Sequence, residues 1–158
     1  MTRLERQAAR LALPLDAQRP PVNALRVRVA GEEYAAPLAQ LLEILPANLT
    51  ALPRTAPHVA GLQVVRGELL GVLRADVLLT GRVHASSLPG RVLLTSAGAA
   101  TCGLLVDDVT DLVWTDDSLR PPLFHTPGVT GLTAGGLAVL DLARLLQAPA
   151  PPWLTAPL

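Results

Sequence analysis

The stretch from Gly61 to Leu79 decides the fold, and it reads GLQVVRGELLGVLRADVLL. Two apolar runs flank the short segment Arg66–Glu68, whose glycine and two charged side chains are typical of a tight turn. The sequence therefore predicts a β-hairpin with a charged tip. The latter half of this stretch recurs, because residues 70–79 and 137–146 both follow the pattern LxVLxxxxLL. A unit of strand and helix used twice indicates two similar halves rather than one enzyme pocket.

The amino-acid composition limits what this chain can do. Half of its 158 residues are hydrophobic, which allows a sizeable core, but only 3% are aromatic, so we expect a core of Leu, Val and Ala. Thirteen basic residues balance thirteen acidic ones. Since nucleic-acid binding requires a basic surface that neutralises phosphates, we expect no nucleic-acid partner.

No segment has the features of a membrane span or an export signal. A helix needs about 20 apolar residues to cross a bilayer, and no apolar run approaches that length. The first six residues, MTRLER, lack the apolar core of a secretory signal, so we expect a soluble cytoplasmic protein that does not span a membrane. The single cysteine, Cys102, rules out an internal disulfide, and its apolar neighbours indicate a small buried side chain.

The chain divides into a body and two terminal segments. Residues 1–23 are interpreted as an N-terminal extension, partly helical or disordered, because prolines interrupt a short apolar pattern with helical spacing. That pattern consists of Leu4, Ala8, Leu11 and Leu15. Residues 24–147 carry the strand patterns and form the predicted body, and residues 148–158 are a proline-rich tail.

Most of the body is predicted to be strand. The predicted strands are short runs of apolar or alternating residues between turn residues. Besides the two strands of the opening hairpin, they lie at residues 25–29, 34–36, 92–95, 101–106, 109–114, 129–132 and 137–140. Nine or ten short strands with little helix favour small β-barrels, and the repeated unit favours two of them packed together.

Three short helices are expected between or after these strands. Pro37 suits the first turn of a helix over residues 37–45, whose leucines have helical spacing. A helical turn over residues 75–79 should end at Gly81. Asp141 should cap a C-terminal helix at residues 142–146, because its carboxylate can accept backbone N–H bonds.

The sequence contains no pattern of residues that is typical of an enzyme, metal or cofactor site. There is no phosphate-binding glycine motif, and the three histidines are scattered over separate loop-like regions. The adjacent pairs Asp107-Asp108 and Asp116-Asp117 would point to opposite faces of a strand, so neither forms an acid/base couple. We therefore expect no catalysis, cofactor or metal.

The charged tip of the first hairpin has two interpretations from the residues alone. Arg66 and Glu68 flank Gly67, and opposite charges at a turn can be solvated and contribute little to stability. Alternatively, an arginine on a rigid turn beside apolar side chains makes a good anchor for a protein partner.

Several segments in this order resemble the CheW-like domain of bacterial chemotaxis coupling proteins. The resemblance covers residues 24–147. The matching segments are EEY at 32–34, LLEIL at 41–45, LPRTAPHVAG at 52–61, RG at 66–67, GLLVD at 103–107, LRPP at 119–122 and GLAVLDLARLL at 136–146.

The resemblance implies a fold and a function. The implied fold is mainly β, with two packed five-stranded SH3-like β-barrels and short helices. The implied function is a non-catalytic adaptor that couples the tip of methyl-accepting chemoreceptors to the regulatory domain of the histidine kinase CheA. Arg66 and Gly67 fall on the family's hairpin, and Glu43 and Leu41 on its Val-x-Glu segment. With Glu68 at the tip, these are the candidate partner-binding residues.

Three positions depart from the family pattern, and two other functions stay open. Val64, Gly71 and Arg74 stand where the family has Asn, Pro and Asp. Because an arginine cannot cap a helix as an aspartate does, we expect the helix after Arg74 to be weakened or reshaped. The departures suit a divergent adaptor of a pilus or other non-flagellar pathway. A small β-barrel that binds a ligand is the remaining alternative, and it would require an enclosed polar pocket.

Overall fold

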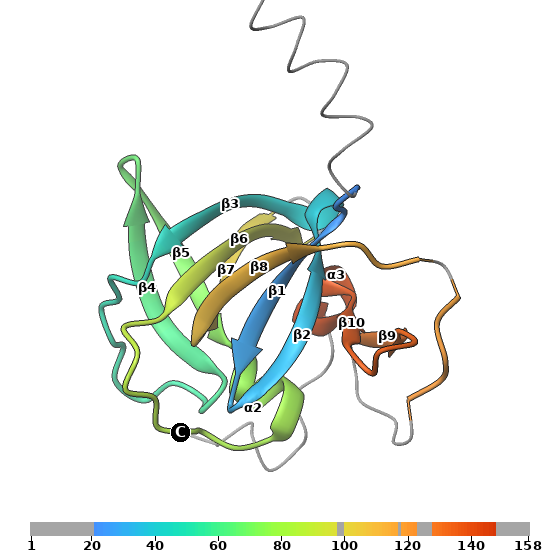
Figure 1. Ribbon diagram of the computed structural model, residues 1–158. Coiled ribbons are helices and arrows are strands. Elements are labelled where there is room, and N and C mark those ends of the chain that lie inside the picture. Colours follow the sequence, from blue (N-terminus) through green and yellow to red (C-terminus); the bar gives the residue numbers. More distant parts are fainter. Residues whose placement is uncertain (1–20, 98–99, 117, 123–127, 148–158) are drawn as a thin grey trace, which may run out of the picture.

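The computed structural model describes residues 21–97, 100–116, 118–122 and 128–147 (Figure 1). Within these ranges, ten strands form two five-stranded sheets. Sheet A has the order β8-β1-β2-β10-β9, with β1 Ala24–Val29, β2 Glu32–Pro37, β8 Asp108–Val113, β9 Val129–Leu132 and β10 Ala138–Leu140. Sheet B has the order β3-β6-β7-β5-β4, with β3 Leu41–Pro46, β4 Val59–Val65, β5 Glu68–Arg74, β6 Arg91–Ala97 and β7 Ala100–Val106.

Three short helical segments complete the described part. They are the 3₁₀ turn η1 (Leu38–Gln40), α2 (Ala75–Thr80) and α3 (Leu142–Gln147). None of the described helices is long and apolar enough to cross a bilayer. The expectations for residues 1–20 and for the proline-rich tail fall outside the described residues.

The repeated sequence unit occupies equivalent places in the two sheets. β5 leads into α2, and β10 leads into α3. β5 runs parallel to β7 with Val72 opposite Gly103, and β10 runs parallel to β2 with Val139 opposite Ala35. β7 and β2 are in turn the second strands of the hairpins β6–β7 and β1–β2. The prediction of a mainly β protein with two similar five-stranded halves is therefore confirmed.

In each sheet, the segment that follows one edge strand bridges to the opposite edge strand. Thr50 follows the edge strand β3 and forms an antiparallel bridge with Leu62 of the opposite edge strand β4, with N···O distances of 2.8 and 2.9 Å. In sheet A, Arg120 follows β8 and bridges Leu132 of β9, with both N···O distances 2.8 Å. The two halves thus use the same device to join their edges, which gives each half the form of a small barrel.

A glycine lies next to each of these bridges. A Cβ atom on Gly61 would collide with the carbonyl oxygen of Thr50, and one on Gly131 would lie 2.8 Å from the carbonyl oxygen of Arg120. Both sites therefore require a residue without a side chain. In sheet B the buried amide of Gln63 adds a second link, because it accepts from the backbone N–H of Asn48 (2.9 Å) and donates to the carbonyl of Pro46 (3.1 Å).

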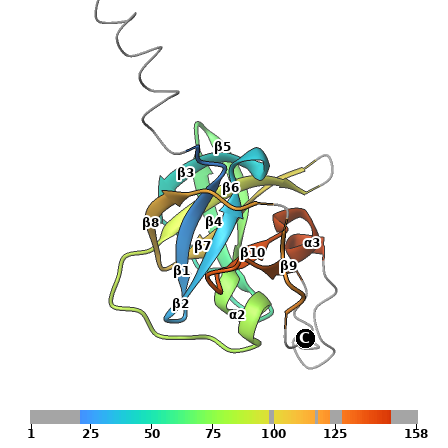
Figure 2. The ribbon, with the colours of Figure 1, turned by 45° about the vertical axis from the view of Figure 1, so that its right-hand side comes forward.

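The largest apolar core lies between the two sheets. It joins residues of β1 and β2 with residues of β6 and β7 and with both α-helices, and α3 of one half contacts β6 of the other (Figure 2). Its buried members are Leu25, Val27, Val29, Ala36, Ala75, Leu93, Leu104, Val106, Leu140, Leu142 and Leu145. Each half also has a smaller core of its own. The expectation of a core of Leu, Val and Ala agrees with these clusters.

Gln40 ties three elements together at the border of the two halves. Its side-chain oxygen accepts from the backbone N–H of Leu142 (2.6 Å), and its Nε2 donates to Oδ1 of Asp141 (3.0 Å). Its backbone carbonyl accepts the hydroxyl of Thr95 on β6 (2.7 Å). Asp141 also accepts from the N–H of Arg144 (3.2 Å), as expected of the residue that caps α3.

The predicted helix over residues 37–45 is wrong. Only η1 is helical, and β3 then pairs with β6, for example Ile44 with Leu93. Exposure alternates along β3, with Leu41 and Leu45 half-buried and Leu42 and Ile44 exposed, which is the period of a strand. The leucine spacing fits both periods, and pairing with β6 decides in favour of the strand.

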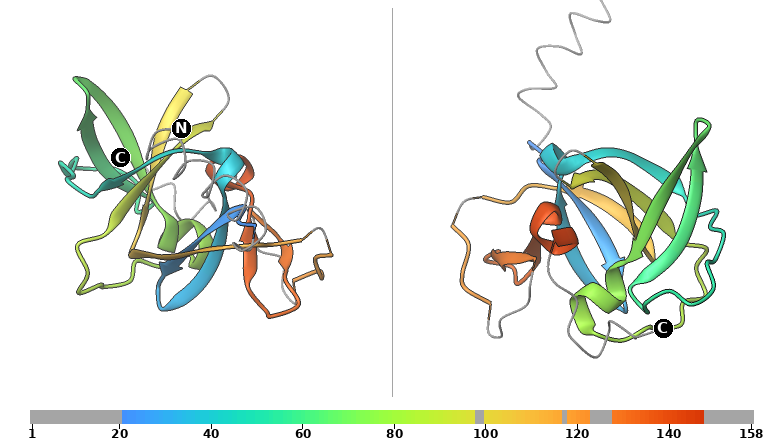
Figure 3. Two further views of the ribbon diagram at one scale, coloured as in Figure 1. Left: turned by 45° about the horizontal axis from the view of Figure 1, so that its top comes forward. Right: turned by 180° about the vertical axis from the view of Figure 1, so that it is seen from behind.

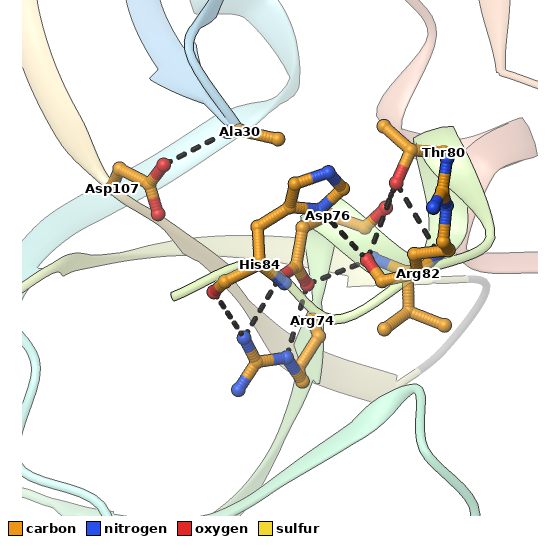
Figure 4. A network of polar contacts seen from close by, with 8 residues as sticks. Ala30, Arg74, Asp76, Thr80, Arg82, His84 and Asp107 are labelled. Carbon is orange, nitrogen blue, oxygen red and sulfur yellow. Dashed lines mark hydrogen bonds and ion pairs between the residues drawn. The ribbon is translucent and has the colours of Figure 1, made fainter. Parts of the chain in front are cut away.

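The helix after Arg74 forms despite the missing aspartate. α2 has six residues, as α3 does, and ends at Gly81 in the left-handed conformation, as predicted. Arg74 makes no side-chain capping bond, but it pairs with Asp76 through Nε (3.0 Å) and Nη2 (2.7 Å) (Figure 4). Asp76 accepts from the backbone N–H groups of Val77 (2.8 Å) and His84 (2.8 Å). Asp76 thus takes over the role of acceptor two residues further on, and the helix keeps the length of α3.

The carboxylate of Asp76 is nearly buried and stays charged at neutral pH. Burial acts to raise the pKa of Asp76, but the hydrogen bonds from Arg74, His84 and Val77 outweigh it and lower that pKa. The side chain of Asp76 is 7% exposed, and its loss would leave the partly buried Arg74 guanidinium with only the carbonyl oxygen of His84 (3.4 Å) as acceptor. This network fixes the start of the loop from Arg82 onward against α2.

Gly61→Ala should reduce the free energy of unfolding by at least about 2 kcal/mol, because the new Cβ must displace the bridge at Thr50. The matched control is Gly71→Ala on β5, where a Cβ meets nothing within 4 Å and a small gain is expected. Urea titration measures both. Equal stabilities of the two variants would contradict the role of the bridge.

Asp76→Asn should destabilise the protein at neutral pH and much less in acid. A carboxylate whose folded-state pKa is lowered contributes stability above its unfolded pKa, and that contribution is lost as the pH falls through the folded value. The deficit should be roughly 1–3 kcal/mol at pH 7. Urea melts from pH 7 to pH 3 measure it, with the exposed Glu32→Gln as control. A deficit that stays constant with pH would show that charge plays no part.

Candidate protein-interaction surface

The tip of the β4–β5 hairpin is a two-residue turn formed by Arg66 and Gly67. Their φ angles are 49° and 83°, and the last strand pair is Val65 with Glu68. Two positive φ angles are typical of the tight turn that matches the twist of a hairpin. Glycine adopts this conformation freely, whereas arginine is strained in it, so the turn directs the Arg66 side chain at some cost in stability. Figure 3 shows the hairpin projecting from the body.

An ion pair joins this tip to the edge strand β3. Nη2 of Arg66 lies 2.7 Å from Oε2 of Glu43, and the exposed fractions of the two side chains are 71% and 34%. The hydrogen bond from Arg66 holds the pKa of Glu43 below its usual value. An exposed pair adds little to stability, so its effect is to orient the guanidinium. Two of the predicted site residues, far apart in the sequence, are thus brought together.

Exposed apolar side chains lie on the hairpin that carries Arg66. Val64 and Leu69 are opposite each other on β4 and β5 and are 64% and 66% exposed. On β3, Leu42 and Ile44 are 60% and 41% exposed, but neighbouring residues of a strand point to opposite faces, so both lie on the face of β3 away from Glu43. We name Val64 and Leu69 with Glu43 and Arg66 the hairpin surface. Exposed apolar side chains around a fixed charge are typical of a site that binds another protein.

The other predicted site residues have different surroundings. Gly67 lies at the hairpin tip, where a Cβ atom would meet nothing within 4 Å. Glu68 is exposed as the first residue of β5, and its charge helps to raise the pKa of Arg66. Leu41 is half-buried and packs against the core between the sheets, so its part in any contact is indirect. The roles of all five residues in binding stay predictions.

Sequence reasoning missed the apolar members of the hairpin surface. The exposed Leu42 and Ile44 on the other face of β3 were missed too, because the wrong helix mixes the two faces of this strand. Val64 and Leu69 could have been found, because counting outward from the Arg66–Gly67 turn places them opposite each other at the second strand pair.

Elsewhere the described part of the chain offers little for chemistry. One hollow of about 540 Å³ is open and is lined by Arg26, Arg28 and Glu33 among others, and both arginines pair with Glu33. No group of three or more His, Cys, Asp or Glu that could hold a metal occurs among the described residues. Cys102 is half-buried rather than buried as expected, and this burial raises the pKa of its thiol, which disfavours the thiolate.

Two comparisons with known proteins relate this geometry to others. Residues 23–150 match the family model described as CheW-like domain. The scaffolding protein TtCheW from Thermoanaerobacter tengcongensis has a similar fold, with a TM-score of 0.70 and 20% sequence identity over 84% of this chain and 97% of that one. No protein with a curated description matches the chain.

Arg66→Ala should raise the pKa of Glu43 toward its ordinary value, because the largest influence that lowers it is the hydrogen bond from Arg66. An NMR titration of the Glu43 carboxyl carbon measures this change. Arg54→Ala is the control, since Arg54 forms no ion pair among the described residues and lies in the exposed connector before β4. A Glu43 pKa that is the same in all three proteins would contradict the ion pair.

Proposed function

Because this chain belongs to the CheW-like domain family, we propose that it is a non-catalytic adaptor that couples chemoreceptors to the histidine kinase CheA. The proposed partners are the cytoplasmic tip of a methyl-accepting chemoreceptor and the regulatory domain of the kinase. The proposed place of action is the cytoplasm, where both partners would be accessible. The single observation that supports this function best is the hairpin surface on a body of two joined barrels.

The hairpin surface supports an adaptor because it is built for contact rather than for reaction. Val64 and Leu69 present apolar area on a projecting hairpin, and the Glu43 ion pair fixes Arg66 beside them. A partner that covers the apolar pair would exclude water from Arg66, which strengthens its hydrogen bonds to a carboxylate or carbonyl of that partner. A small-molecule site would instead require an enclosed pocket with converging polar groups.

The test is direct binding in solution. Isothermal titration calorimetry should show that the protein binds the kinase regulatory domain and a receptor fragment that contains the tip. It should also show that the second partner binds to the preformed complex, because an adaptor must hold both at once. No binding to either partner at high micromolar concentration would contradict the proposal, as would strict competition between the two.

Arg66→Ala, and separately Val64→Thr with Leu69→Thr, should weaken binding to one of these partners by at least about tenfold. The melting temperature should change little, because all three side chains are exposed. Arg54→Ala is the matched control and should bind as the unchanged protein does. A large loss of thermal stability in Arg66→Ala would mean that Arg66 serves the fold instead.

A further inference from the structure

A second exposed apolar site lies on sheet A, on the edge strand β8 and its continuation. Leu112 and Trp114 are 49% and 55% exposed, and they share one face because they are two residues apart in extended chain. Tryptophan carries a large apolar area and is enriched where proteins make contacts. This site is separate from the hairpin surface, which lies on sheet B, so the inference goes beyond the proposed function.

The described chain begins beside this site, at residues 21–23, which follow the N-terminal segment of residues 1–20. Asn23 is clamped to the end of β8, because its N–H donates to the carbonyl of Val113 (3.0 Å) and its side chain exchanges bonds with the backbone N–H (2.8 Å) and carbonyl (2.7 Å) of Thr115. Figure 1 shows the start of β1 next to this end of β8. The segment is therefore followed, three residues after its end, by a residue that is bonded to Thr115, the neighbour of Trp114.

The charges of the segment and of β8 are complementary. Asp111 and Asp116 are exposed and lie on either side of Leu112 and Trp114 in the sequence, and residues 107–117 contain five Asp and no Lys, Arg or His. The N-terminal segment has four Arg against one Glu and one Asp, a balance of +2. The C-terminal tail, residues 148–158, has no charged side chain, so charge favours the N-terminal segment as the occupant.

The residue pattern and the length of the N-terminal segment also suit a helix that lies along β8. At 100° per residue, Leu4, Ala8 and Leu11 share one helical face, and Arg3 and Arg10 lie together at one side of it. A helix over residues 3–13 would be about 16 Å long, close to the roughly 20 Å of the six-residue β8. A lone helix of this length is marginal in water, so its formation requires a surface on which the apolar face is buried.

We propose that the N-terminal segment docks as an amphipathic helix along β8. In the docked state Leu4, Ala8 and Leu11 cover Leu112 and Trp114. Arg3 and Arg10 approach the carboxylates of Asp111 and Asp116. Docking shields an exposed tryptophan within the same chain, and raised salt weakens it because part of the attraction is between exposed charges.

Acrylamide quenching of Trp114 tests this proposal in the full chain. Trp153→Phe leaves Trp114 as the one tryptophan, because the chain contains two. In that background Leu11→Asp should raise the quenching constant about twofold, since a side chain covered most of the time becomes exposed all of the time. The matched control is Leu13→Asp, which places the same charge on the opposite helical face and should leave quenching unchanged.

Charge exchange gives an independent readout. Asp111→Lys with Asp116→Lys should raise quenching, and adding Arg3→Glu with Arg10→Glu should restore it. Circular dichroism melts verify that each variant keeps the folded body. Equal quenching in Leu11→Asp and its parent overturns the proposal, as do equal effects of Leu11→Asp and Leu13→Asp. It is also overturned if deletion of residues 148–158 exposes Trp114 while Leu11→Asp does not, or if quenching falls with protein concentration, which would mean a second copy covers the site.

Discussion

The structure depends on one apolar core that neither sheet could bury alone. A sheet of five short strands has two faces, and closing it on itself buries only one of them. The cores inside the single halves are small, with Val65, Val72, Val92 and Leu94 in one and Ala24, Ala35 and Val139 in the other. The outer faces of β1, β2, β6 and β7 are just as apolar, and they are buried against each other and against the two helices. The two halves are therefore one folding unit.

Sequence patterns were sufficient to predict the elements that are determined by residues close together in the sequence. The hairpin around Arg66 and Gly67, the repeated strand and helix, and the ends of α2 and α3 all follow from local rules for turns, caps and periodicity. They failed at β3, where leucines at positions 41, 42 and 45 fit a helix and a strand equally well. A strand at the edge of a sheet is decided by the neighbour it pairs with, and that neighbour, β6, is about 50 residues away in the sequence.

The candidate site likewise combines features set by local sequence with features set by distant residues. Arg66 and Gly67 could be identified because a turn with positive φ has a local signature. The partner of Arg66 could not be derived from spacing, since Glu43 reaches it only through the curling of sheet B. The bridges next to Gly61 and Gly131 are a second example of long-range pairing that a short sequence pattern does not reveal. Both lie in related segments, VAGL at 59–62 and VTGL at 129–132, whose meaning becomes clear only when each bridge is seen.

Gln40 has a mechanical consequence. Its amide holds the first turn of α3 while its own carbonyl holds β6, so the seam between the halves is pinned by polar bonds at its rim and by leucines at its centre. Any hinge motion between the two halves would break these hydrogen bonds and at the same time expose the buried leucines to water. These contacts therefore oppose movement of one half relative to the other. Whatever binds at one end is held at a set distance and angle from whatever binds at the other, as by a rigid bracket.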